Sequence, residues 1–166
     1  MWFTRTRRRH CYNKTRHRIK QRKRIRMDLN KLKETFENWD SNNNKIYIKT
    51  DVFKSIDYIK NHFHFDMLKS ITAIDNQDSG IELIYHLYST DDDENVLVSI
   101  TVFNETESIS ELFDSAIADE REIYDLFGVK FNGNKELGRI YMPEGWIGHP
   151  LKKDYIENDE RLKWND

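Results

Sequence analysis

Residues 119–155 read DEREIYDLFGVKFNGNKELGRIYMPEGWIGHPLKKDY, and this stretch decides how the chain is organised. Its first part, 119–127, carries apolar residues on one side of a short helix. Gly128 follows where a helix commonly ends, because glycine enters the left-handed conformation without steric cost. The second part, 139–155, is too rich in glycine and proline for a regular element. It predicts an ordered, extended segment, called the arm below.

Charged residues on the predicted helix do not form a catalytic pair. Arg121 and Asp125 are four residues apart and can meet on one helical face, in the weaker of the two orientations for such a pair. Glu120 and Glu122 are two apart, so their carboxylates point in well-separated directions. The stretch therefore offers no pair of carboxylates for acid–base chemistry.

Other catalytic and ligand-binding patterns are also missing from the sequence. No glycine-rich phosphate loop exists, because Gly145 and Gly148 neither follow a strand nor open a helix. His62 and His64 lack an evident third metal ligand. A single cysteine, Cys11, excludes an internal disulfide and a cysteine-built cluster. We expect no catalytic, cofactor-binding or metal-binding residue in this chain.

The arm favours a protein–protein interface over a self-contained lobe that only holds its own loops. Arginine, tryptophan, tyrosine and histidine are concentrated there beside turn residues. These side chains are the usual anchors of interfaces. An arm such as 145–155 also has few ways to satisfy its own backbone, and a partner surface would supply them.

The rest of the chain predicts one α+β domain, with helices covering a mixed or antiparallel sheet and the arm at its C-terminal end. Period-two alternation joined by polar turns is typical of antiparallel strands. The predicted helices are 28–39, 51–62 and a segment from Ser108 or Ser110 through 117, and the predicted strands are 45–49, 68–74, 80–88 and 96–103.

Charge is distributed very unevenly. Residues 1–26 hold twelve Lys or Arg and no acid, whereas the remainder holds fifteen Lys or Arg against twenty-nine Asp or Glu, a net charge of −14. An acidic body argues against nucleic-acid binding by residues 27–166 and suits a basic partner surface. No apolar run approaches the roughly 20 residues of a transmembrane helix.

Three interpretations of residues 1–26 stay open. The segment is a non-native extension preceding a start at Met27, an organellar targeting peptide, or a disordered basic arm that contacts lipid headgroups or RNA. The expected organisation is thus an extension at 1–26, a domain at 27–155 and a short tail at 156–166.

Two segments together resemble the signature of the thirty-kilodalton subunit (NuoC type) of respiratory complex I: EREIYDLFGVKF and RIYMPEGWIGHPLKKDY. Related subunits occur in energy-converting membrane-bound hydrogenases. The resemblance is sharp over the 119–155 stretch and weaker from about Met27 onward. Two sites depart from the family pattern: Asn134-Lys135 stands where a His-Pro pair is usual, and Gly138 replaces one of two successive arginines.

The resemblance implies a cofactor-free peripheral subunit of an NADH:quinone oxidoreductase. Such a subunit docks on the forty-nine-kilodalton-type subunit, beside an iron–sulfur subunit, and supports electron transfer to quinone coupled to ion translocation. The iron–sulfur clusters, FMN or a nickel–iron site belong to partner subunits. The expected location is the cytoplasmic side of the cell membrane, or the matrix side in a mitochondrion.

The resemblance also assigns docking or folding roles to individual residues. The motif positions are Glu120, Arg121, Glu122, Asp125, Phe127, Gly128, Arg139, Gly148, His149, Pro150, Leu151, Lys153 and Asp154. Two alternatives remain at this point. One is the equivalent subunit of an energy-converting hydrogenase or another complex I-like dehydrogenase, and the other is a small RNA-binding protein that uses the basic N-terminal segment.

Overall fold

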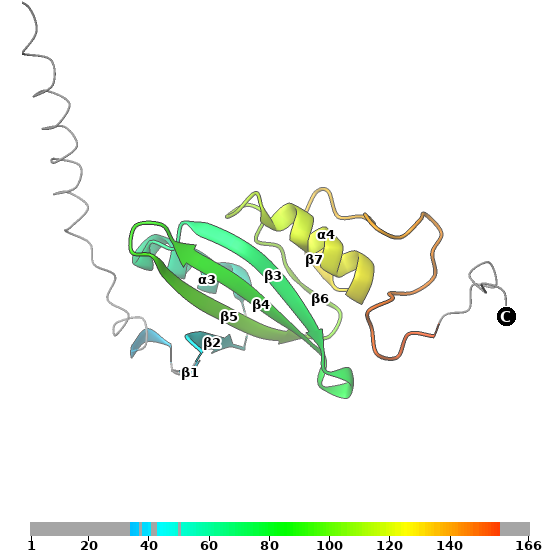
Figure 1. The fold of residues 1–166 in the computed structure, drawn as a ribbon, viewed down its shortest axis with the longest axis horizontal. Coiled ribbons are helices and arrows are strands. Elements are labelled where there is room, and N and C mark those ends of the chain that lie inside the picture. Colours follow the sequence, from blue (N-terminus) through cyan, green and yellow to red (C-terminus); the bar gives the residue numbers. More distant parts are fainter. Residues whose placement is uncertain (1–33, 37, 41–42, 50, 157–166) are drawn as a thin grey trace, which may run out of the picture.

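The computed structural model describes residues 34–36, 38–40, 43–49 and 51–156. In chain order these form β1 (Trp39–Asp40), β2 (Lys45–Ile48), α3 (Val52–Phe63), β3 (Met67–Asp75), the short 3₁₀ helix η1 (Gln77–Ser79), β4 (Ile81–Ser89), β5 (Glu94–Val102), β6 (Glu105–Glu107), α4 (Ala116–Phe127) and β7 (Lys130–Asn132). The described chain begins beside β1 and ends with the arm, at opposite ends of the molecule (Figure 1).

Five strands form one mixed sheet in the order β1-β2-β5-β4-β3. β2 runs parallel to β5, and the other neighbouring strands pair antiparallel. Along β4 and β5 the register sets Leu83 opposite Ile100 and Tyr85 opposite Val98. All four side chains are buried, so these strands cover the core with one face. The predicted α+β class is confirmed, and the sheet is mixed.

Both helices contribute to the core that lies against this face. Ile56 and Ile59 of α3 and Ile123 of α4 are buried in the same cluster as the strand residues. α4 lies beside β3, next to the arm (Figure 1), and Asp119 accepts a hydrogen bond from the backbone N–H of Ile71 at 2.9 Å. β3 is the edge strand of the sheet, and the Asp119 carboxylate thus satisfies one of its backbone N–H groups that has no partner strand.

Two predicted helices differ from the structure. The helix expected from Ser108 or Ser110 is wrong for 108–115, because the chain makes turns there and α4 starts only at Ala116. The Ser108 hydroxyl donates to Glu120 at 2.7 Å instead of capping a helix. The helix expected at 28–39 lies largely outside the described residues, and it does not reach Trp39, which belongs to β1.

A small parallel sheet of β6 and β7, which the sequence did not predict, connects the segment after β5 to the segment after α4. Residues 133–156 then form turns and bends with no helix or strand, as expected for an extended arm. Among the described residues, no helix is long and apolar enough to cross a membrane.

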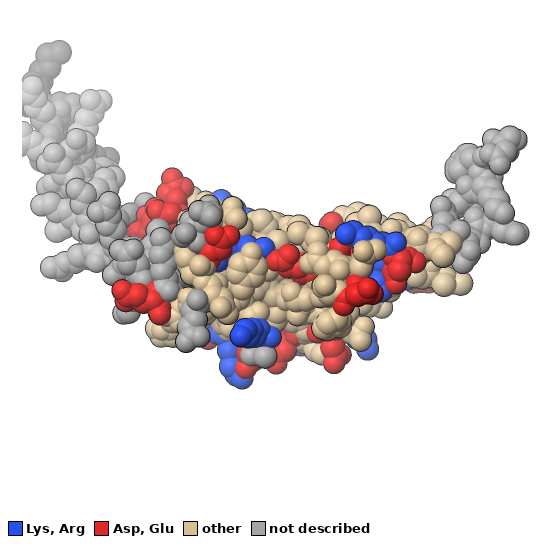
Figure 2. All heavy atoms as spheres, turned by 90° about the horizontal axis from the view of Figure 1, so that it is seen from below, with Lys and Arg blue, Asp and Glu red and all other residues tan. Residues whose placement is uncertain are grey.

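One long face of the molecule carries acidic and basic side chains interspersed with uncharged atoms (Figure 2). A nucleic-acid-binding face requires clustered cations that neutralise phosphates. The described residues on this face form no such continuous basic surface.

Candidate functional site

The motif residues lie where α4 ends and the arm begins. Gly128 terminates α4 in the left-handed conformation, with φ of 80°, and its N–H donates to the Tyr124 carbonyl at 3.0 Å. The His149 ring packs directly on this glycine, because a Cβ built there would lie 2.6 Å from a ring carbon. Gly128 therefore serves both the helix end and the close approach of the arm.

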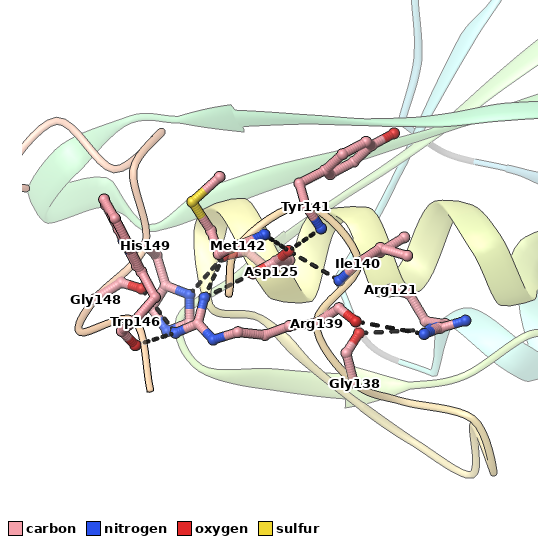
Figure 3. Close-up of polar contacts among 10 residues, drawn as sticks. All are labelled: Arg121, Asp125, Gly138, Arg139, Ile140, Tyr141, Met142, Trp146, Gly148 and His149. Atoms are coloured by element: carbon pink, nitrogen blue, oxygen red, sulfur yellow. Dashed lines mark hydrogen bonds and ion pairs between the residues drawn. The ribbon is translucent and has the colours of Figure 1, made fainter. Parts of the chain in front are cut away.

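Asp125 is the centre of the junction between helix and arm (Figure 3). Its fully buried carboxylate accepts the backbone N–H groups of Ile140, Tyr141 and Met142 at 2.7–3.0 Å. Arg139 adds an ion pair at 2.6 Å. Burial by itself disfavours the charged form, but these donors outweigh it and hold the pKa of Asp125 below its ordinary value.

Arg139 completes the junction from the side of the arm. Its guanidinium donates to the Asp125 carboxylate and carbonyl, and to the carbonyls of Trp146 and Gly148 at 3.0 Å each (Figure 3). The fork of donors in arginine can reach several acceptors at once, which a lysine ammonium does less well. Arg139 thus holds the 146–148 segment of the arm near the C-terminal end of α4.

Arg121 does not pair with Asp125, contrary to the pairing that their spacing allowed. Its guanidinium donates to the carbonyls of Gly138 and Arg139, at 3.4 Å each. Both Asp125 oxygens already bind Arg139 or the arm backbone, so no ion pair with Arg121 forms there. Arg121 makes the longer and weaker contacts of the two arginines.

Glu120 and Glu122 point apart, as their spacing predicted. Glu120 is fully buried and accepts hydrogen bonds from the Ser108 hydroxyl, the Ile109 N–H and the Asn134 amide at 2.7–2.8 Å. Burial raises the pKa of Glu120 above its ordinary value in spite of these donors. Glu122 accepts a hydrogen bond from the Tyr141 hydroxyl near the surface. Asn134, at a site of departure from the family pattern, therefore has a defined structural role.

The remaining motif residues fasten the arm along its length. His149 Nδ1 lies 3.0 Å from the Asp125 carbonyl oxygen, so Nδ1 carries the proton, because a carbonyl only accepts. The Leu151 N–H donates to the carbonyl of Leu126, and the Lys153 N–H donates to the Asp75 carboxylate.

Fewer contacts are made by the other motif residues, which are Phe127, Gly148, Pro150 and Asp154. Phe127 is half-buried against the core, and Gly148, with φ of 86°, lies against the Tyr155 ring. Pro150 is half-buried, and Asp154 forms an exposed ion pair with Lys152 at 3.7 Å.

Three residues that hold the site carried no sequence signal for this role. Asp75 ends β3, far from the arm in sequence, and it also accepts the Gln77 N–H. These backbone donors hold the pKa of Asp75 below its ordinary value against the effect of burial. Ser108 and Asn134 become partners of Glu120 only when 108, 120 and 134 come together in the fold.

The polar groups of this arrangement bind one another. They form hydrogen bonds and an ion pair within the chain, and the His149 ring binds the backbone of α4. Within residues 34–156, apart from the four positions not described, no group of three or more His, Cys, Asp or Glu could hold a metal ion.

Comparison with known proteins identifies the family. The profile of the family described as the respiratory-chain NADH dehydrogenase, 30 Kd subunit, matches residues 46–161. The chain belongs to this family. The match covers nearly the whole sheet, α4 and the arm, so it includes every motif residue described above.

Members with individual names agree with this assignment. The chain is similar to the chloroplastic J subunit of NAD(P)H-quinone oxidoreductase from Lemna minor, with 37% identity over 67% of this chain and 75% of that one. It is 39% identical to the C subunit of NADH-quinone oxidoreductase from Moorella thermoacetica over 55% of this chain and 64% of that one.

Some relatives are much longer than this chain. The C/D subunit of NADH-quinone oxidoreductase from Phocaeicola vulgatus is 37% identical over 60% of this chain, but the match spans only 20% of that protein. A solved structure of a trypsin-resistant fragment of Nqo5 aligns with a TM-score of 0.49 and 24% identity, over 54% of this chain and 79% of the fragment.

Proposed function

We propose that this chain is the C-type subunit of an NADH:quinone oxidoreductase of the complex I type, and that it docks on the forty-nine-kilodalton-type subunit. Its role is to hold that subunit in place for electron transfer to quinone, without binding a cofactor itself. The observation that carries the proposal is the arm, which the family profile includes and which the chain fastens to α4 through Asp125.

The names of the relatives support the NADH:quinone branch over the hydrogenase alternative. The C, C/D and J subunits all belong to quinone oxidoreductases by name. The name C/D supports a close association with a D-type subunit, because it joins both subunits in one chain. Peripheral attachment to a membrane through such partners, on the side the resemblance implies, remains part of the proposal.

Co-expression tests the docking. A tagged version of the chain is expressed with the forty-nine-kilodalton-type and neighbouring iron–sulfur subunits of the same complex, and the stoichiometry of the purified material is measured. We expect a stable complex with the large subunit that salt weakens without dissociating, because salt screens the contacts between charges but not the apolar ones. A large subunit that assembles equally well without this chain, and never binds it, would overturn the proposal.

The cofactor-free role has its own measurement. We expect the purified chain to show no flavin or iron–sulfur absorbance, because its single cysteine cannot ligate a cluster and it lacks a nucleotide loop. Stoichiometric iron or flavin in the isolated chain would contradict this part.

A further inference from the structure

In the arm, backbone polar groups bind the rest of the subunit, whereas several apolar side chains are exposed to solvent. Its polar backbone groups face its own chain: 140–142 donate to Asp125, Leu151 to Leu126, and Lys153 to Asp75. An isolated extended segment would leave such groups to water. The arm thus satisfies these backbone groups within the subunit, so the expectation that it needs a partner surface for them is wrong.

Several of its large apolar side chains face outward instead, although Met142, Trp146 and Tyr155 are half-buried. The exposed fractions are 43% for Ile140, 59% for Tyr141, 89% for Ile147 and 51% for Leu151. Single exposed apolar residues are ordinary, but a succession of them on an ordered segment marks an interaction surface. Ile147 is the most exposed of the large apolar side chains among the described residues.

The charges beside these side chains do not suit a membrane or a nucleic acid. The arm itself carries Glu144, Lys152, Lys153 and Asp154, and its Tyr141 hydroxyl donates to Glu122 of α4, so the signs are mixed. Binding to anionic lipid or phosphate requires a cluster of cations. An apolar surface with mixed charges at its rim has the composition of a protein interface.

We infer that the arm is a docking element formed before binding, in which contact and positioning are divided between two sets of residues. The exposed side chains of Tyr141, Ile147 and Leu151 make the contacts with the D-type subunit. Asp125 and Arg139, the most distinctive polar residues of the motif, do not touch that subunit. They are positioning residues that fix the arm, so docking does not bear the entropy cost of ordering it. This inference rests on the proposed function.

The kinetics of binding to the purified D-type subunit separate the two sets. Ile147→Ser removes a contact, so we expect dissociation to be faster by about tenfold or more, with little change in association. Amide hydrogen exchange of 140–142 and 151 in the free chain stays as slow as in the wild type. Met67→Ser, an exposed apolar residue at the far end of β3 from Asp75, is the matched control and leaves binding unchanged.

Arg139→Ala tests positioning. We expect faster amide exchange at 140–142 in the free chain and slower association, because the arm must then be ordered during binding. Arg139→Lys keeps the positive charge beside Asp125 and restores part of the protection, and it serves as the variant if Arg139→Ala does not fold.

The possible outcomes distinguish this inference from the proposed function. A wild-type chain that does not bind the D-type subunit overturns the proposed function. Normal wild-type binding with an unaffected Ile147→Ser variant, or unchanged arm exchange in the Arg139 variants, overturns only the inference. Dimers of the free chain that Ile147→Ser abolishes would assign the surface to a second copy of this chain, and would overturn it as well.

Discussion

A single buried carboxylate determines the path of the arm. Asp125 accepts three consecutive backbone N–H groups and an arginine, so the chain must fold around it at 139–142. A buried charge is tolerated only when it is fully paired, and Asp125 meets that condition within the subunit. All of these partners of Asp125 belong to its own chain.

Gly128 offers a direct test of the contact between helix end and arm. We expect Gly128→Ala to destabilise the free protein by at least about 1–2 kcal/mol, the cost of a left-handed backbone for a residue with a Cβ. The collision with His149 adds to this cost. Chemical denaturation of both single variants and the double variant with His149→Ala measures the coupling. If Gly128→Ala costs as much in the His149→Ala background as in the wild type, the ring does not rest on this glycine.

The stability of the protein should depend on pH through Glu120. Its pKa in the folded state lies above the ordinary value of 4.5, so the folded protein binds more protons than the unfolded one as pH rises past that value. Stability contributed by the neutral form is complete below 4.5 and is lost as pH rises through the folded-state pKa. We expect Glu120→Gln to gain stability relative to the wild type between pH 4.5 and 8, measured by urea unfolding. A difference that is independent of pH would contradict this.

At the scale of elements, alternation in the sequence was enough to find the central strands. The predicted strands at 68–74, 80–88 and 96–103 correspond to β3, β4 and β5. Burial alternates strictly along β4, whereas Ser99 interrupts the alternation in β5 and a register shift between Leu68 and Ser70 interrupts it in β3. The parallel pairing of β2 with β5 was not predictable, since a short strand of four residues carries no signal for its partner.

The helix predicted at 108–115 does not form because contacts distant in sequence determine the conformation there. Ser108 is a good helix cap by propensity, but its hydroxyl and the next N–H bind Glu120. Ile109 and Phe113 are buried among the core residues, and this packing favours the observed turns. Distant partners, here twelve residues along the chain, override local propensity.

The two arginines between α4 and the arm should differ in their effect on stability. We expect Arg139→Ala to cost about 1.5–3 kcal/mol, the range for a hydrogen bond to a charged group, because it leaves the buried Asp125 without its ion pair. Arg121→Ala loses only two long contacts and should cost less than about 1 kcal/mol. Thermal melting of the free protein compares them, with Leu83→Ala as a core control expected to cost about 2–5 kcal/mol. Equal losses for the two arginines would contradict the geometry.

At the scale of the whole molecule, the sequence was enough to locate the site. It was not enough to show which residues of the site bind within the chain and which are exposed. The 119–155 stretch was found from its composition and its resemblance to the family. Which of its residues face inward could not be found, because Asp75, Ser108 and Asn134 reach the site only through the sheet and β7. For Arg121, Arg139 and 149–154, the choice between docking and folding roles that the resemblance left open stays a matter of prediction. Their bonds within the chain favour a supporting role for Arg139.

The uneven charge of the chain leads to a prediction about residues 1–26, which lie outside the described residues. This segment has twelve Lys or Arg and no apolar periodicity, whereas the remainder has a net charge of −14. We expect deletion of 1–26 to change the free energy of unfolding by less than about 2 kcal/mol, since the segment offers no core residue. Any loss should come from attraction between opposite charges, so it should vanish at high salt.

Thermal melting of the full chain and the shortened chain, at low salt and at about 1 M salt where the Debye length is near 3 Å, separates the two sources of stability. A loss above about 2 kcal/mol that persists at high salt would mean that the segment packs on the body through apolar contacts. The acidic body would then owe part of its stability to a segment that its composition marks as unable to fold alone.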